Sequence, residues 1–272
     1  MRFFLFSRID RAEAVAFAGS LAADLASAGH EVLLEENTAH KLHKDGIGFD
    51  DMPGKADIVV AIGGDGTVLR AVSAMKHQVP IIGVNWGEVG FLADLERGHA
   101  SSFLRSLEPG FPIEKRMRLS FEDETGSIGE ALNEALIVTS RPAKMLRFSI
   151  VIDDIVAETF RADGVILSTP TGSTAYAMSA GGPIVDPGID GVLLVPLAPY
   201  MLSSRPHIIS TERKIEIRLE SDKPANLVID GVEIRRLGLS ASIRVRRSEH
   251  PAHFITARRT FFEKVEQKLR RL

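Results

Sequence analysis

Hydrophobic and polar residues alternate with two different periods along this chain, and the period changes near Arg116. Before that point, short apolar runs typical of buried strands stand between runs with helical spacing. Strands are predicted at residues 3–6, 31–35, 57–62 and 80–84, and helices at 12–28 and 68–75. Because strands that alternate with helices form parallel sheets, we expect an α/β domain over residues 1–115. Gly29 stands where the first helix should end.

After Arg116 the apolar residues recur at every second position, as in residues 148–153, 214–219 and 242–246. Turn signals such as Asp153-Asp154, Asp186-Pro-Gly188 and Asp230-Gly231 separate these runs. The pattern predicts an all-β antiparallel domain over residues 116–250.

The tail, residues 251–272, ends in a run that has helical spacing. Its apolar positions are Phe261, Phe262, Val265, Leu269 and Leu272. One apolar stripe on a short helix is typical of packing against a domain. We therefore expect the tail to pack back onto the first domain, in preference to binding a membrane or a partner.

Composition narrows the class of protein. The 272 residues carry a formal net charge of −3 and are 44% hydrophobic, which suits two globular domains and gives no basic surface for nucleic acid. The absence of cysteine excludes disulfides, thiolate metal sites and a cysteine nucleophile. The apolar start, Met1–Phe6, breaks too early for a signal sequence or a membrane span. We expect a cytoplasmic protein without membrane or nucleic-acid partners.

One loop carries the strongest chemical signal. The apolar run that begins at Ala56 ends in Gly63-Gly-Asp-Gly-Thr67, just before the second predicted helix. Glycines allow positive φ and let an anion approach backbone N–H groups, and the helix N-terminus favours the same charge. An acid there repels a bare phosphate unless it binds magnesium, accepts a proton or hydrogen-bonds a hydroxyl. The alternative is a tight turn capped by Asp65 and Thr67.

A second strand-like run, within residues 163–183, opens into a loop rich in hydroxyl groups. Thr169, Thr171, Ser173 and Thr174 can donate to phosphate or ribose oxygens. Tyr176 offers a flat face to a base or ring. A structural turn explains the proline and glycines of this loop better than it explains the hydroxyls.

Together these segments closely resemble the NAD kinase family. The matching segments are Gly63–Thr67, Asn85–Asp94, Asn133-Glu134, Asp163–Pro183, Pro196–Pro199, Ser203–Pro206 and Ile229–Gly231. The first segment alone is shared with phosphofructokinases and with diacylglycerol or sphingosine kinases, but the combination is specific. The resemblance implies a Rossmann-like first domain and transfer of the γ-phosphate of ATP, or of polyphosphate, to the 2′-hydroxyl of the adenosine ribose of NAD.

The resemblance also implies roles for single residues. Asp65 would deprotonate the hydroxyl, Asn133 and Glu134 would bind ribose hydroxyls, and Asp163 would meet the nicotinamide end across a subunit boundary. The other implied binding positions are Gly63, Gly64, Gly66, Thr67, Arg70, Phe91, Lys144, Arg161, Thr171, Thr174, Ala175, Tyr176, Ser179 and Ala198. The chain departs from many relatives at Tyr200, where a histidine is common.

Cofactor and assembly follow from the same resemblance and from charge. A triphosphate donor needs Mg²⁺ or another divalent cation, held chiefly by phosphates and water because the sequence shows no metal cage. The resemblance implies a homodimer or homotetramer. No P-loop and no Gly-x-Gly-x-x-Gly after a strand occurs. A lipid or sugar kinase with the same acidic loop and a non-catalytic dinucleotide-binding regulator stay open as alternatives.

Overall fold

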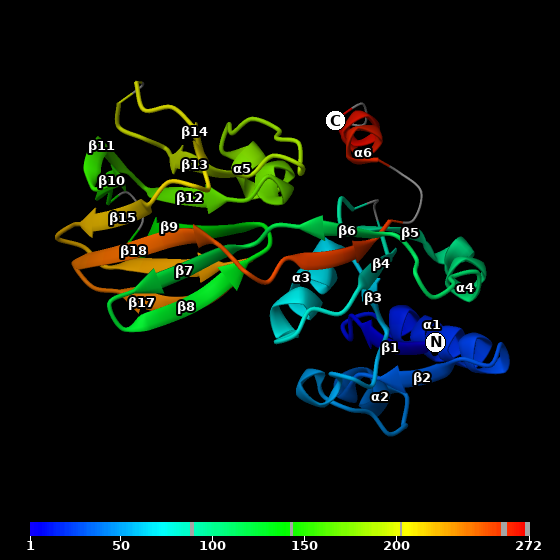
Figure 1. Cartoon of the computed structure of the whole chain (residues 1–272). Helices are drawn as coiled ribbons and strands as arrows, with labels where there is room; N and C mark the ends of the chain where they lie inside the picture. Colours follow the sequence, from blue (N-terminus) through cyan, green and yellow to red (C-terminus); the bar gives the residue numbers. More distant parts are fainter. Residues whose placement is uncertain (88–89, 142–143, 202, 257–259, 270–272) are drawn as a thin grey trace. The chain divides into compact units, whose positions relative to one another are not determined.

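The computed structural model describes residues 1–87, 90–141, 144–201, 203–256 and 260–269. The chain folds as two compact units (Figure 1). Unit 1 comprises Met1–Lys115 together with the segment that begins at Ala252, and unit 2 comprises Arg116–Pro251. Among the described residues, no helix is both long and apolar enough to span a bilayer.

Unit 1 is built on a seven-stranded sheet with the order β2-β1-β3-β4-β19-β6, and β5 also pairs with β4. Its strands are β1 (Arg2–Ser7), β2 (Glu31–Leu34), β3 (Ile58–Gly63), β4 (Ile81–Asn85), β5 (Ala93–Glu96), β6 (Ile113–Arg116) and β19 (Ala252–Ile255). Its helices are α1 (Ala12–Ser27), α2 (Glu36–Lys41), η1 (Phe49–Asp51), α3 (Asp65–Ala74), α4 (Arg97–Arg105) and α6 (Phe261–Leu269). The central pairings, from β2 through β4, are parallel, as the alternation of strands and helices predicted.

The sheet of unit 1 is apolar on both faces because helices cover both. In β3, Ile58, Val60 and Ile62 join the core formed with α1 and α4. Helix α3 packs on β3 and β4 and buries Val68 and Val72. Strands buried on both faces read as continuous apolar runs, which is how β3 appears in the sequence.

Three strands of unit 1, β5, β6 and β19, were not predicted. β19 lies in the segment that was expected to pack only as a tail, yet Phe254 pairs in parallel with Ile81 of β4. β5 pairs in parallel with β4 through Gly83 and Ala93. All three strands are only four residues long, too short to show a clear period. Helix α6 follows β19, and its Phe261 ring lies 6.2 Å from that of Phe91. Leu272 and the side chain of Leu269 lie outside the described part.

Unit 2 is a sandwich of two six-stranded antiparallel sheets, ordered β11-β10-β15-β18-β7-β8 and β14-β13-β12-β9-β16-β17 (Figure 1). The first contains β7 (Leu119–Asp123), β8 (Gly126–Ala131), β10 (Leu146–Ile152), β11 (Ile155–Ala162), β15 (Ile215–Glu220) and β18 (Ser240–Arg247). The second contains β9 (Glu134–Thr139), β12 (Gly164–Ser168), β13 (Gly191–Leu197), β14 (His207–Ser210), β16 (Ala225–Ile229) and β17 (Val232–Leu237). Two short helices, η2 (Thr171–Thr174) and α5 (Tyr176–Ser179), follow β12. The predicted antiparallel β fold is confirmed.

One apolar core lies between the two sheets of unit 2 and draws alternate residues from each. Phe148 and Ile217 come from the first sheet, and Ile137 and Leu167 from the second. The hairpin turns form where the sequence predicted them. Asp230 and Gly231 have φ of 46° and 82°, which a two-residue turn with right-handed twist requires.

Candidate functional site: two acid-capped loops

The glycine loop runs directly from β3 into α3. Gly63 ends the strand, and Gly64 precedes the helix with φ −95° and ψ −172°. The expectation of positive φ in this loop is wrong: none of its three glycines has it. The glycines instead allow neighbouring groups to come close to the backbone. A Cβ on Gly63 would collide with Thr67, whereas Gly64 and Gly66 face open space where a ligand would meet no side chain.

The first turn of α3 forms the floor of this open space. The first N–H groups of a helix have no partner within the helix, and they carry the positive end of its dipole. The side chain of Thr67 is buried at 5% exposure and packs against Gly63. The loop therefore offers backbone donors, unobstructed by side chains, to an anion.

Asp65 begins α3, and its carboxylate is held by three consecutive backbone amides. Oδ2 accepts from the N–H of Phe91 at 2.8 Å, and Oδ1 accepts from those of Leu92 at 3.0 Å and Ala93 at 2.9 Å. Gly90 lies so close that a Cβ there would overlap Oδ1. An ionised carboxylate has about four acceptor positions. The described residues use three, so among them one position on Oδ2 stays open to a further donor.

Two other predicted residues belong to this unit. Arg70 is exposed, and its guanidinium lies over the ring of the buried Phe6, 5.5 Å from the ring centroid. Phe91 is half-buried and contributes its backbone N–H to Asp65. Glu88 and Val89, which belong to the matching segment 85–94, lie outside the described residues.

The second loop, in unit 2, is organised in the same way around Asp230. This aspartate sits in the turn between β16 and β17 and accepts from the N–H groups of Leu132 at 2.7 Å, Asn133 at 2.8 Å and Glu134 at 3.1 Å. Burial raises the pKa of Asp230, while the three N–H donors and Arg118 oppose that shift. The sequence showed Asp230 only as a turn signal and a family match, without this role.

Glu134, at the start of β9, is a titratable group whose pKa lies far from its ordinary value. Burial, reinforced by the nearby charge of Asp230, raises its pKa to about 8, although the backbone of Tyr176 opposes the shift. Its Oε2 is buried and has no hydrogen-bond partner among the described residues. A buried carboxyl oxygen without a partner is costly. A ribose hydroxyl would satisfy this oxygen, as donor to the ionised carboxylate or as acceptor from the protonated acid.

The hydroxyl groups of the loop after β12 divide into two kinds. Ser168 and Thr169 bond the carbonyls of Asn133 and Leu132, and Ser173 bonds the backbone of Val185. These groups bind the loop to the protein, so Thr169 and Ser173 are not free to donate to a phosphate as the sequence suggested. Thr171 differs, because its hydroxyl is buried and has no partner in the part of the chain that the structure describes.

The predicted residues of unit 2 lie at opposite ends of β12. Glu134 pairs with Ser168 at one end, close to η2 and α5, where Tyr176 and Ser179 are exposed. Gly164 pairs with Leu197 at the other. That second end is flanked by Asp163, Arg161 and Ala198. Four residue steps of a strand span roughly 13 Å. The two groups therefore form separate clusters within the unit.

The remaining residues complete this picture. Thr174 and Ala175 lie between η2 and α5, with Thr174 buried. Ala198 has φ of +45°, a conformation that costs energy for a residue with a Cβ. Tyr200 is 72% exposed, and its N–H donates to the carbonyl of Arg161. Lys144 is exposed.

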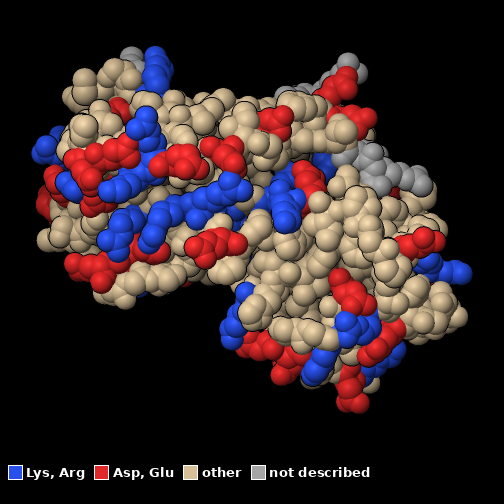
Figure 2. Space-filling view, viewed as in Figure 1, with Lys and Arg blue, Asp and Glu red and all other residues tan. Residues whose placement is uncertain are grey.

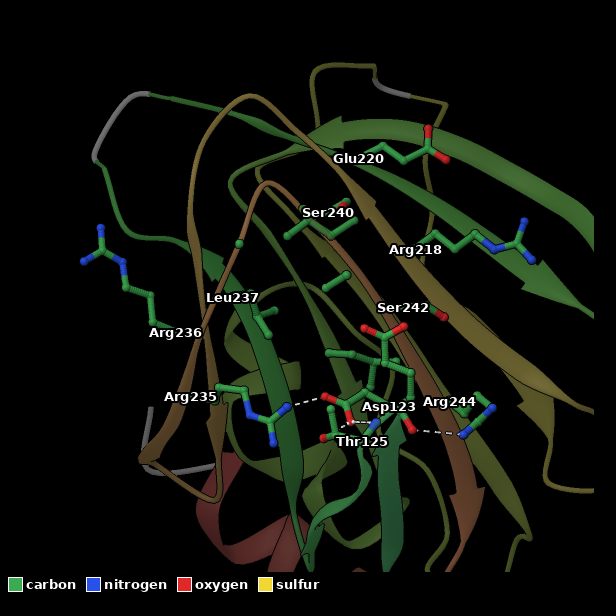
Figure 3. A pocket seen from close by; sticks show the side chains of 15 residues that line it. Asp123, Thr125, Arg218, Glu220, Arg235, Arg236, Leu237, Ser240, Ser242 and Arg244 are labelled. Atoms are coloured by element: carbon green, nitrogen blue, oxygen red, sulfur yellow. Dashed lines mark hydrogen bonds and ion pairs between the residues drawn. The ribbon is translucent and has the colours of Figure 1, made fainter.

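A cavity of about 600 Å³ in unit 2 contains none of the predicted residues. It lies among β7, β15, β17 and β18, and its arginines are largely engaged (Figure 3). Arg235 pairs with Asp123, and Arg244 donates to the carbonyl of Asp123. Figure 2 shows the same mixture of basic and acidic groups over this side of the surface. The cavity therefore lacks the concentrated positive charge that a polyphosphate requires.

No cluster of three or more His, Asp or Glu side chains suited to holding a metal occurs in the part of the chain that the structure describes. The glycine loop instead has one carboxylate with one open acceptor position. Mg²⁺ in phosphoryl-transfer sites is commonly bound by one or two carboxylates, substrate phosphates and water. A cation that arrives with its nucleotide would therefore be held chiefly by phosphates and water.

Family models match both units. The model described as the ATP-NAD kinase N-terminal domain matches residues 4–110, and that of the ATP-NAD kinase C-terminal domain matches residues 132–257. The NAD kinase of Methanoculleus marisnigri is 58% identical over 272 residues, 100% of both chains. That of Methanothermobacter thermautotrophicus is 41% identical over 275 positions, 99% of this chain and 96% of the relative.

Solved structures agree with these relatives. An NAD kinase from Archaeoglobus fulgidus, crystallised with ATP, superposes with a TM-score of 0.81 at 30% identity over 100% of both chains. Yeast NADH kinase, in complex with NADH, has a TM-score of 0.90 at 24% identity over 99% of this chain and 87% of its own, which shows the shared fold. These matches favour a nucleotide kinase over the lipid or sugar kinases that share the acidic loop. The chain belongs to the NAD kinase family.

Proposed function

We propose that this protein transfers the γ-phosphoryl group of ATP to the 2′-hydroxyl of the adenosine ribose of NAD, forming NADP. The observation that carries the proposal is the Asp65 carboxylate. Three amides fix its orientation at the carboxyl end of β3, and one acceptor position is left unused by the residues that the structure describes. In parallel α/β sheets this edge is where ligands bind.

Asp65 accepts the hydrogen bond of the 2′-hydroxyl and then its proton. Phosphoryl transfer requires little covalent work from the protein, so positioning and charge stabilisation carry most of the catalysis. The open faces of Gly64 and Gly66 leave the first-turn amides of α3 accessible to the donor phosphates. Mg²⁺, when bound with ATP, neutralises phosphate charge.

The loop of unit 2 receives the dinucleotide. Glu134 Oε2 and the hydroxyl of Thr171 are buried polar atoms that find no partner within the described ranges, and ribose hydroxyls would supply both. The amide side chain of Asn133, on a residue 7% exposed, can complete a diol contact. Tyr176 is 47% exposed and can stack on a ring.

The cluster at the other end of β12 supports a homo-oligomer. Asp163, Arg161 and Ala198 lie a strand length away from Glu134, so one dinucleotide-binding loop does not gather all the predicted residues. We propose that this cluster serves the site of a second copy, in a homodimer or homotetramer. Light scattering tests this proposal, and an active monomer would refute it. We also propose a cytoplasmic location, where both nucleotide substrates are available.

The test of the function uses the purified protein with NAD and magnesium ATP, or with polyphosphate as donor, and an NADP-specific enzymatic assay. Asp65→Asn runs in parallel. We expect NADP from the parent and a rate lower by about 10²–10⁴-fold in the variant, the usual contribution of a general base. Calorimetry should show that NAD still binds both. If the parent binds NAD without forming NADP from either donor, it is a dinucleotide-binding regulator.

A further inference from the structure

A buried ion pair lies beside the backbone segment that holds Asp65. Lys264 Nζ lies 2.6 Å from Asp94 Oδ2, and the side chains are only 9% and 6% exposed. Lys264 belongs to α6 and Asp94 to β5, 170 positions earlier in the chain. Lys264 occupies an ordinary helical position in the sequence, and Asp94 is the last residue of the matching segment 85–94.

Lys264 contacts both ends of segment 91–94, which carries the three amides that bond Asp65. Its Nζ also donates to the carbonyl oxygen of Phe91 at 3.2 Å. Phe91 is the first of the three residues whose amides bond Asp65, and Asp94 directly follows the last of them. The amides that orient the carboxylate therefore lie between two contacts made by one ammonium group.

Helix α6 is itself anchored where it supplies this lysine. Thr260 and Glu263 form a reciprocal capping box: the Thr260 N–H donates to Glu263 Oε2 at 2.7 Å, and the Glu263 N–H donates to Thr260 Oγ1 at 3.4 Å. The ring of Phe261 packs near that of Phe91. The lysine is thus presented from an element with a defined start and its own contact to the segment.

We propose that Lys264 is a positioning residue for phosphoryl transfer. Through Asp94 and the Phe91 carbonyl, it holds the three backbone amides that orient the Asp65 carboxylate. This inference rests on the proposed function of Asp65. It assigns helix α6 a part in the reaction through the backbone of residues 91–94.

The consequence is a specific kinetic signature. A loosened segment displaces the acceptor of the hydroxyl proton but leaves the first-turn amides of α3 intact. Small misplacements of catalytic groups can lower rates by as much as about 100-fold. Loss of Lys264 should therefore lower kcat while leaving the KM for ATP nearly unchanged.

Three variants separate positioning from stability. Lys264→Met removes the contacts with Asp94 and with the Phe91 carbonyl, and it leaves Asp94 buried without its partner. Lys264→Met/Asp94→Leu removes both charges, which restores stability in many buried pairs. Arg2→Met is the control, because it breaks the 2.6 Å ion pair with Asp57 in the same unit, away from this segment.

The measurements are kcat, KM for ATP, melting temperature, and hydrogen exchange of a peptide covering residues 90–95. We expect both Lys264 variants to lose about tenfold or more in kcat and their segment amides to exchange roughly tenfold faster, even where the double variant regains its melting temperature. Arg2→Met should change neither kcat nor the exchange of these amides. If the double variant regains full kcat, or if kcat follows melting temperature across all variants, Lys264 acts only in stability. Hydrogen exchange measures how firmly Lys264 holds segment 91–94, and it does not depend on turnover. If the unmodified protein forms no NADP, that result overturns the proposed function but not the contact made by Lys264.

Discussion

The two units share one hydrogen-bonding arrangement but use it for different purposes. In each, an aspartate accepts three consecutive backbone N–H bonds: Asp65 holds residues 91–93 and Asp230 holds residues 132–134. Asp65 stands at the start of a helix beside open glycines, with one acceptor position left for a substrate. Asp230 stands in a hairpin turn, close to a second carboxyl group, Glu134.

This difference shows that the surroundings of a carboxylate determine its role as much as its hydrogen bonds do. Around Asp65 the space is open, so the cap leaves a carboxylate ready to accept. Asp230 lies in a hairpin turn, where burial raises both its pKa and that of Glu134. Asp230 therefore orients a loop, and the substrate-facing role falls to its neighbour.

The largest effect should come from Gly90→Ala in unit 1. The added Cβ would overlap Asp65 Oδ1, so either the carboxylate or its amides must move. We expect kcat to fall by about 100-fold or more, measured with the NADP assay at a temperature well below melting. Gly98→Ala is the matched control, since a Cβ there meets nothing within 4 Å. An active Gly90→Ala enzyme would show that the three-amide cap is dispensable.

Asp230→Asn tests the cap of unit 2. An asparagine presents an NH₂ group to at least one of the three N–H donors, which leaves buried groups unsatisfied. We expect the free energy of unfolding to fall by about 2–4 kcal/mol and the KM for NAD to rise, while the KM for ATP changes little. Chemical denaturation and steady-state kinetics measure both. The control is Asp186→Asn, which alters an exposed turn in the same unit. Equal stability of the Asp230→Asn variant would mean that the strands alone hold residues 132–134.

The smallest effect is a pH dependence that only unit 2 should show. The pKa of Glu134 is about 8 in the folded protein, against 4.5 as its ordinary value. If ribose hydroxyls bond the ionised form, the affinity for NAD should rise by up to about tenfold per pH unit below pH 8 and level off above it. Calorimetry from pH 6.5 to 9.5 measures this, and Glu134→Gln should abolish the slope. A slope that survives in the variant would assign it to another group.

The same raised pKa has a consequence for stability. Between pH 4.5 and 8 the folded protein keeps a proton on Glu134 that the unfolded chain has lost. Stability relative to Glu134→Gln therefore falls as pH rises through this window. Below pH 4.5 both states are protonated and above pH 8 both are ionised, so the difference between the proteins becomes constant.

The sequence by itself determined the local elements and the type of chemistry. The change of period separated parallel α/β from antiparallel β structure, because side-chain spacing follows strand and helix geometry directly. Asp153-Asp154 and Asp230-Gly231 predicted hairpins because few residue pairs tolerate positive φ. The glycine loop and Asp65 were evident because an open anion site needs residues without Cβ atoms.

Only the tertiary structure decided which distant segments meet. β19 joins the sheet beside β4, Asp230 caps residues 132–134, and Lys264 reaches Asp94, each across more than 90 positions of sequence. The opposite ends of β12 likewise separate Glu134 from Asp163. Local period and propensity carry no information on such contacts, because they form where buried area and hydrogen bonding summed over a whole unit outweigh the entropy of closing a long loop.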